Sequence, residues 1–154
     1  MQQNAILSIA AAAGLVLAGP SVRAGEEVSP AAMAKALTEA SVSLDQGLKA
    51  SAPDGTPISG KYEIEHGALQ LSIYTMKGAK FSEVIVDHKS GAIKKSEPIT
   101  DADDMKAAQV QAAAMAKTKV PLDAATSHAV AANAGYRAVS VVPALDAGRP
   151  PPSS

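Results

Sequence analysis

The pattern of apolar and polar positions predicts helices in the first third of the chain. The Ser-Pro pair at 29–30 is typical of a helix N-cap followed by Pro at the first helical position, and residues 31–40 favour a helix. A second short helical pattern places Leu44 and Leu48 one turn apart on one face. The Pro-Asp-Gly turn at 53–55 ends this helical part.

From residue 59 the apolar period becomes two, which predicts antiparallel strands with one buried face. Tyr62, Ile64 and His66 alternate with charged residues, and the close spacing at His66-Gly67 predicts a hairpin. The third strand is the richest in β-branched residues, so we expect it to be the most enclosed. The expected strands cover residues 59–66, 69–74, 81–87 and 92–96.

A structural turn is predicted between the third and fourth strands, at Asp87-His88-Lys89-Ser90-Gly91. The Asp87 side chain can accept hydrogen bonds from backbone amides ahead of it, and Gly91 can take a positive φ. We therefore assign Asp87 and Gly91 a structural role.

The second half of the chain returns to a helical period. Residues 101–119 predict a long helix whose inward stripe comprises Met105, Ala108, Ala112 and Met115. Residues 122–134 predict another helix, with Leu122, Ala125, Ala129 and Val130 facing inward. Residues 136–142 then predict a strand.

An internal repeat relates the two halves. Val42-Ser43-Leu44-Asp45 returns as Val120-Pro121-Leu122-Asp123, and Ala68-Leu69 returns at a similar distance as Ala144-Leu145. The predicted fold is therefore α+β: an N-terminal helix packed on a four-stranded antiparallel meander, then a long helix and a partial second repeat. The predicted units are residues 25–98 and 99–147, followed by a Pro/Ser-rich tail at 148–154.

The half repeat ends in strand 136–142, which is apolar on both faces and has no strand after it. Such a strand invites pairing. It docks onto a sheet edge of the first unit, pairs with another copy or a partner, or belongs to a shortened, aberrant product. We favour the first outcome because an unpaired apolar strand promotes aggregation, and we keep oligomerisation through this strand as an alternative.

The N-terminus resembles a secretory signal peptide. Residues 5–17 form an apolar run, and Val22-Arg23-Ala24 gives a small-residue cleavage pattern after Ala24. The alternative is an uncleaved anchor, but the run is shorter than the roughly 20 residues of a membrane span. We expect a periplasmic or secreted protein of a bacterial envelope, with no membrane span after cleavage of residues 1–24.

Composition excludes several function classes. The chain contains no Cys, only 3% aromatic residues, and 14 basic against 15 acidic residues, so it carries no broad basic surface for nucleic acid. A basic cluster at Lys89, Lys94 and Lys95 is followed directly by acidic residues. We expect no nucleic-acid partner and no cofactor.

Helix, hairpin and valine-rich third strand together resemble the PepSY domain family. The likeness covers about residues 40–97 and is carried by residues 44–50, by 62–74, and by Val84 to Ile93 with its Asp-x-x-Ser-Gly turn. PepSY domains occur in exported proteins and in propeptides of thermolysin-like metalloproteases, where a peptidase-inhibiting role has been proposed. The resemblance implies binding of a protein partner, such as a peptidase, and we expect the partner-binding face to include Tyr62, Ile64 and Tyr74.

The residues carry little sign of catalysis, so we expect no enzyme. No Ser lies in a Gly-x-Ser-x-Gly elbow, glycines do not cluster into a phosphate loop, and the carboxylates read as surface charges. The alternative function is metal binding. His66 and His88 meet if their turns lie at one sheet end, with Asp87 or Glu65 as further ligands, although ordinary turn histidines are the commoner outcome and no metal is expected.

Overall fold

The computed structural model of the protein describes residues 5–12 and 29–145 of the 154 in the chain. The predicted cleavage point after Ala24 and the tail at 148–154 lie outside these residues. In chain order the elements are β1 (Ala5–Ala12), α1 (Pro30–Leu37), α2 (Leu44–Ser51), the 3-10 helix η1 (Ala52–Asp54), β2 (Thr56–Glu65), β3 (Ala68–Lys77), β4 (Lys80–Val86), β5 (Ile93–Pro98), α3 (Ala102–Met115), α4 (Leu122–Ala132) and β6 (Arg137–Leu145).

The strands of the described residues form one antiparallel sheet in the order β1-β6-β2-β3-β4-β5. The predicted α+β class is thereby confirmed. Strand β6 docks onto the first unit, as the sequence favours, by pairing with β2 through Gly60↔Val141 and Lys61↔Ser140. Its other edge pairs with β1, which lies in the segment predicted as an export signal.

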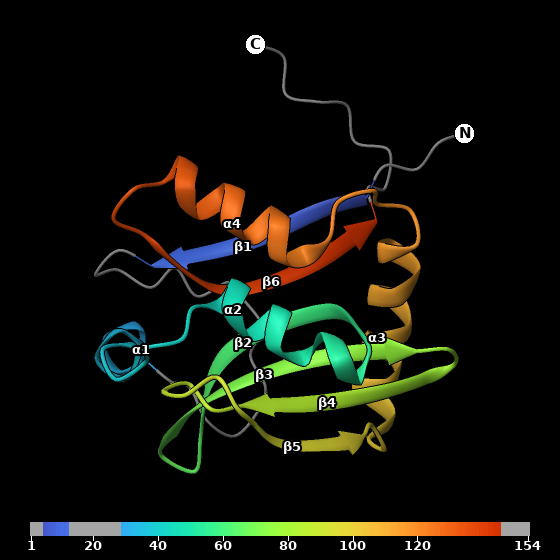
Figure 1. The fold of residues 1–154 in the computed structure, drawn as a ribbon, viewed down its shortest axis with the longest axis horizontal. Coiled ribbons are helices and arrows are strands. Elements are labelled where there is room, and N and C mark those ends of the chain that lie inside the picture. The colour runs from blue at the N-terminus through green and yellow to red at the C-terminus, as the bar shows by residue number, and fades with distance from the viewer. Residues whose placement is uncertain (1–4, 13–28, 146–154) are drawn as a thin grey trace.

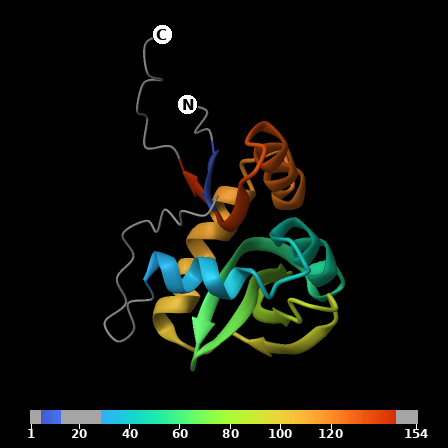
Figure 2. The same ribbon diagram turned by 90° about the vertical axis from the view of Figure 1, so that its left-hand side faces the viewer.

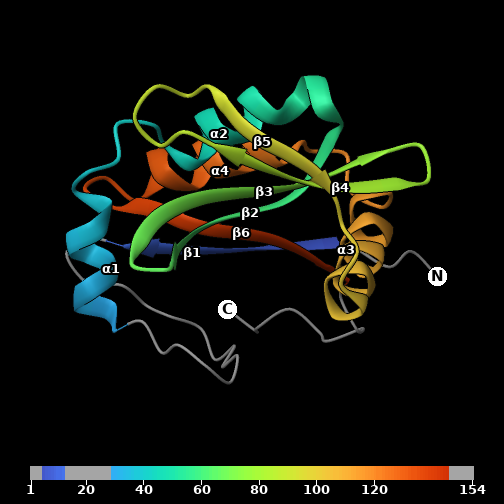
Figure 3. The same cartoon turned by 90° about the horizontal axis from the view of Figure 1, so that it is seen from below.

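The helices cover both faces of this sheet. Helices α2 and α4 lie side by side across one face (Figure 1). Helix α3 lies on the opposite face, against β2 and β6 (Figure 2). Helix α1 lies at the sheet end where the β2–β3 hairpin turns, and α3 at the other end (Figure 3). The main core therefore lies between the sheet and α2 with α4, and a smaller cluster lies beneath α3.

Local sequence explains where the helices begin. The Ser29 hydroxyl accepts a hydrogen bond from the Ala32 N–H at 3.1 Å, and Ser43 forms a capping box with Gln46. Asp101 accepts the N–H groups of Asp103 and Asp104, both at 3.0 Å, at the start of α3. Each cap satisfies amides that have no partner within the helix.

Helix ends differ from the predicted ones. Helix α1 stops at Leu37, not at residue 40, because residues 38–40 continue with hydrogen bonds to the third residue before, such as Ala40 N–H to the Leu37 carbonyl. Arg137 of β6 donates hydrogen bonds to the carbonyls of Leu37 and Ala40. Helix α3 stops at Met115, so the lysines expected in its last turn lie in the following loop. Its inward stripe is as predicted, since Met105, Ala108, Ala112 and Met115 all belong to the cluster beneath it.

The prediction that the third strand is the most enclosed is wrong. In β4 only Val84 and Val86 are buried, whereas β3 buries five residues: Leu69, Leu71, Ser72, Ile73 and Thr75. Strand β3 has neighbours β2 and β4, and it runs beneath α2. Position in the sheet, and not β-branched content, decides burial here.

Space above Gly60 lets α2 approach the sheet closely. A Cβ atom at Gly60 would lie 2.8 Å from Ile73 Cδ1, 3.1 Å from Leu48 Cδ2 and 3.3 Å from Leu44 Cδ1. These three side chains belong to the main core and come from both the helix and the sheet. A side chain at this position must therefore displace several tightly packed groups at once.

We expect Gly60→Ala to lower the free energy of unfolding by about 1–3 kcal/mol, because overpacking outweighs the better strand propensity of Ala. Urea unfolding followed by circular dichroism measures this. Glu65→Ala, an exposed change on the same strand, is the control. An unfolding free energy for Gly60→Ala equal to or above the wild-type value would contradict the packing described here.

Candidate partner-binding surface

The predicted partner-binding face does not exist as one surface. Tyr62 pairs with Leu71 and Ile64 with Leu69, so both side chains point toward α2, whereas Tyr74 lies on the opposite face in the cluster beneath α3. Tyr62 is only 3% exposed, and its hydroxyl donates a hydrogen bond to the Val42 carbonyl. Tyr62 is thus a core residue that ties the loop before α2 to β2.

Burial perturbs both tyrosines. Burial raises the pKa of Tyr62 to about 12, although the nearby positive charge of Arg137 opposes the shift. Burial also raises the pKa of Tyr74, and the negative charge of Asp104 adds to the effect. Both hydroxyls therefore stay protonated at neutral pH and act as hydrogen-bond donors.

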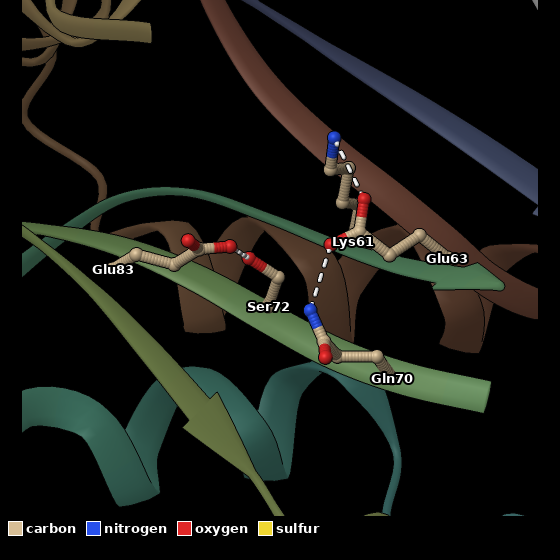
Figure 4. Close-up of polar contacts among 5 residues, drawn as sticks. All are labelled: Lys61, Glu63, Gln70, Ser72 and Glu83. Carbon is tan, nitrogen blue, oxygen red and sulfur yellow. Dashed lines mark hydrogen bonds and ion pairs between the residues drawn. The ribbon is translucent and has the colours of Figure 1, made fainter. Parts of the chain in front are cut away.

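Polar side chains from three strands cover part of the face turned away from α2 (Figure 4). Gln70 Nε2 donates to Glu63 Oε1 at 3.1 Å, and Lys61 Nζ lies 3.1 Å from Glu63 Oε2. The Ser72 hydroxyl donates to Glu83 Oε1 at 2.6 Å. Because Ser72 is 1% exposed, this hydroxyl is closed to a substrate, and the network links neighbouring strands.

The turn after β4 has the geometry of an Asx turn. Asp87 Oδ1 accepts the N–H groups of Lys89 at 2.8 Å and Ser90 at 3.0 Å, and these hydrogen bonds lower the pKa of the Asp87 carboxyl. Gly91 has φ +80°, and its N–H donates to the Asp87 carbonyl at 2.8 Å. Both residues act within the turn, and the His88 carbonyl accepts the N–H groups of Ser41 and Val42.

The histidines are not gathered into a metal site in the part of the chain that the structure describes. The turns of His66 and His88 do lie at the same sheet end, but the His66 side chain is 90% exposed and contacts Glu65 at 3.6 Å. The Nδ1 atom of His88, by contrast, is buried and has no hydrogen-bond partner among the described residues. Among the described residues no three His, Asp or Glu side chains converge.

Strand β5, at the end of the meander, and strand β6, in the half repeat, differ in their charged residues. The outer edge of β5 carries Lys94, Lys95 and Glu97 and ends in Pro98, and every residue of β5 is exposed. Charges and proline at an edge discourage pairing with further strands. Residues 138–145 of β6 contain no charged residue and one proline, Pro143, so β6 carries less of this protection than β5.

A shallow cleft of about 620 Å³ lies between α3 and β6. Its apolar lining includes Val110 and Val142, which are 54% and 38% exposed. Its other lining residues are Asp103, Lys106, Ala107, Gln111 and Pro143. An apolar floor with a polar rim is typical of a surface that receives side chains of another protein.

Sequence reasoning did not find this cleft because its two walls come from distant segments. One signal was present: Val110 is an apolar, β-branched residue that lies off the inward stripe of α3. Its exposure is unusual for its type and marks the helix face that needs an explanation.

No protein-family model, curated protein or solved structure matches the chain. None of the described helices is long and apolar enough to cross a membrane.

Tyr62→Phe should lower the free energy of unfolding by about 1 kcal/mol at neutral pH, because the Val42 carbonyl loses its donor. In the wild type, the raised folded-state pKa of Tyr62 gives stability that is complete below about pH 10 and is lost as pH rises toward about 12. The Tyr62→Phe variant should not show the part of the stability loss at alkaline pH that comes from Tyr62.

Urea unfolding at about pH 8 and about pH 11 separates these effects. The exposed Tyr136→Phe is the control and should follow the wild type at both values. Equal alkaline losses in the wild type and Tyr62→Phe would show that burial of Tyr62 is not the cause.

Proposed function

We propose that this protein is a small exported, non-catalytic module, similar to a PepSY domain, that binds another envelope protein. Its residues 25–98 would form the PepSY-like unit, a helix on a four-stranded meander, and 99–147 an incomplete second unit. Export is supported by the signal-like residues 1–24. A peptidase is the partner class that the resemblance suggests.

The exposed apolar cleft between α3 and β6 carries the proposal. A partner that covers the exposed area of Val110 and Val142 stabilises the complex by about 1 kcal/mol for each valine. Asp103, Lys106 and Gln111 around them can form hydrogen bonds or ion pairs that set the orientation of the partner. Such a surface binds a protein by one or two apolar side chains inserted into the cleft.

The position of the cleft favours recognition without any change of fold. Helix α3 packs on the core through its own residues Met105, Ala108, Ala112 and Met115, and β6 pairs with β2. Both walls are regular elements on a packed core, so the surface is formed before a partner arrives. Preformed surfaces avoid the ordering cost of flexible loops.

We expect Val110→Asp to abolish partner binding, because it places a charge in the apolar floor of the cleft. The matched control is Val120→Asp, which changes another exposed valine, 44% exposed, in the loop after α3. The full-length wild-type chain and both full-length variants are immobilised and incubated with periplasmic extract, and retained proteins are identified by mass spectrometry.

A protein retained by the wild type and by Val120→Asp but lost with Val110→Asp supports the proposal. Inhibition of a thermolysin-type peptidase by the same three proteins then tests the peptidase assignment. Absence of any specifically retained protein, or equal retention by Val110→Asp, would refute binding through this cleft.

A further inference from the structure

The outer edge of β6 is occupied by a strand from the segment predicted to be removed on export. Strand β1 pairs with β6 from Ala5↔Leu145 to Ala12↔Arg137, with an irregularity between Ala10 and Ala11. If residues 1–24 are cut off, β6 loses this neighbour. Apart from Pro143, which has no N–H, the edge then presents unpaired N–H and C=O groups along residues 138–145, which carry no charge.

The internal repeat shows what belongs at this edge. Helix α2 precedes β2 as α4 precedes β6, the two helices lie together, and the two strands pair with each other. On its far side β2 pairs with the antiparallel β3. On the corresponding side of β6 no described residue of the half repeat forms a strand, and the antiparallel β1 takes that place.

Pairing with β2 does not depend on this edge. The register between β2 and β6 comprises only Gly60↔Val141 and Lys61↔Ser140, whereas residues 142–145 pair with β1 alone. Helices α3 and α4 also contact β6, so contacts other than those with β1 hold it against the sheet. The outer edge borders the cleft at Val142, so a strand bound there continues the same surface.

We propose that the outer edge of β6 is a strand-binding site, which accepts an extended, uncharged aliphatic segment of a partner protein in place of β1 after export. This inference rests on the proposed function and names the form of the partner. Binding would add one antiparallel strand to the sheet, with main-chain hydrogen bonds as the principal contacts.

The occupant is a partner segment and not a second β6 strand. The sequence that fills the edge in the structure, Ala-Ile-Leu-Ser-Ile-Ala-Ala-Ala, contains neither proline nor charge. A second β6 would bring Pro143, which has no N–H, and Arg137, which already binds the end of α1. Both features oppose pairing between two copies.

The test uses the full chain with a specific protease site inserted between Ala24 and Gly25, so that the protein folds before it is cut. A fluorescent peptide with the sequence of residues 5–12 and a two-lysine tail is titrated into cut and uncut protein, and anisotropy is measured. We expect binding to the cut protein and at least about 100-fold weaker binding to the uncut one, whose tethered β1 competes.

Two changes test the pairing itself. A peptide with both Leu7→Pro and Ser8→Pro loses whichever of these two N–H groups faces β6, and it should not bind. In the protein, changing both Ala144 and Leu145 to proline removes whichever of these two N–H groups faces β1. This double change leaves the β2 register untouched and should weaken peptide binding about tenfold. Val120→Asp, in the loop after α3, should leave peptide binding within about twofold.

The proposal would be overturned if the cut protein still unfolds cooperatively but does not bind the peptide, or if the proline peptide binds equally well. It would also be overturned if the cut protein forms a dimer that does not bind the peptide, or if it loses its fold and the peptide does not restore it. Peptide binding that fails while capture of a partner through Val110 persists refutes this inference alone. The reverse result refutes only binding through the cleft.

Discussion

The two halves of the molecule meet at Gly60, and the rest of the structure depends on the space above it. Gly60 lies beneath Leu44 and Leu48 of α2, beside Ile73 of β3, and opposite Val141 of β6. Because it has no side chain, the helix can sit low on the sheet while β6 pairs alongside. Gly60 thus lies where β2 pairs with β6, next to the second pair Lys61↔Ser140.

This junction also determines which surfaces can bind a partner. It places α2 and α4 over one face of the sheet, where they bury the aliphatic core and Tyr62 with it. The other face and the margin of the sheet carry α3 and β6, which together line the cleft of the proposed function. The charged β5 at the far margin is protected against pairing with further strands.

Much of the fold could be predicted from the sequence because local rules agree with the final packing. Caps at Ser29 and Ser43 and the hairpin at His66-Gly67 are set by neighbouring residues alone. The prediction of the partner-binding face was wrong because the two-residue turn pairs Ile64 with Leu69. This register places Tyr62 and Tyr74 on opposite faces of the sheet. The cleft could not be predicted, since Val110 and Val142 meet only through the tertiary fold.

The central claim is that β6 belongs to the sheet through β2 and keeps its outer edge for an exchangeable strand. Amide hydrogen exchange, measured by NMR on the chain with and without residues 1–24, tests it most directly. We expect the shortened chain to keep slow exchange in β2 and β3 and at the β6 amides that face β2, and to lose it only at outward-facing β6 amides. Unchanged protection along β6, or its loss along the entire strand, would contradict the account.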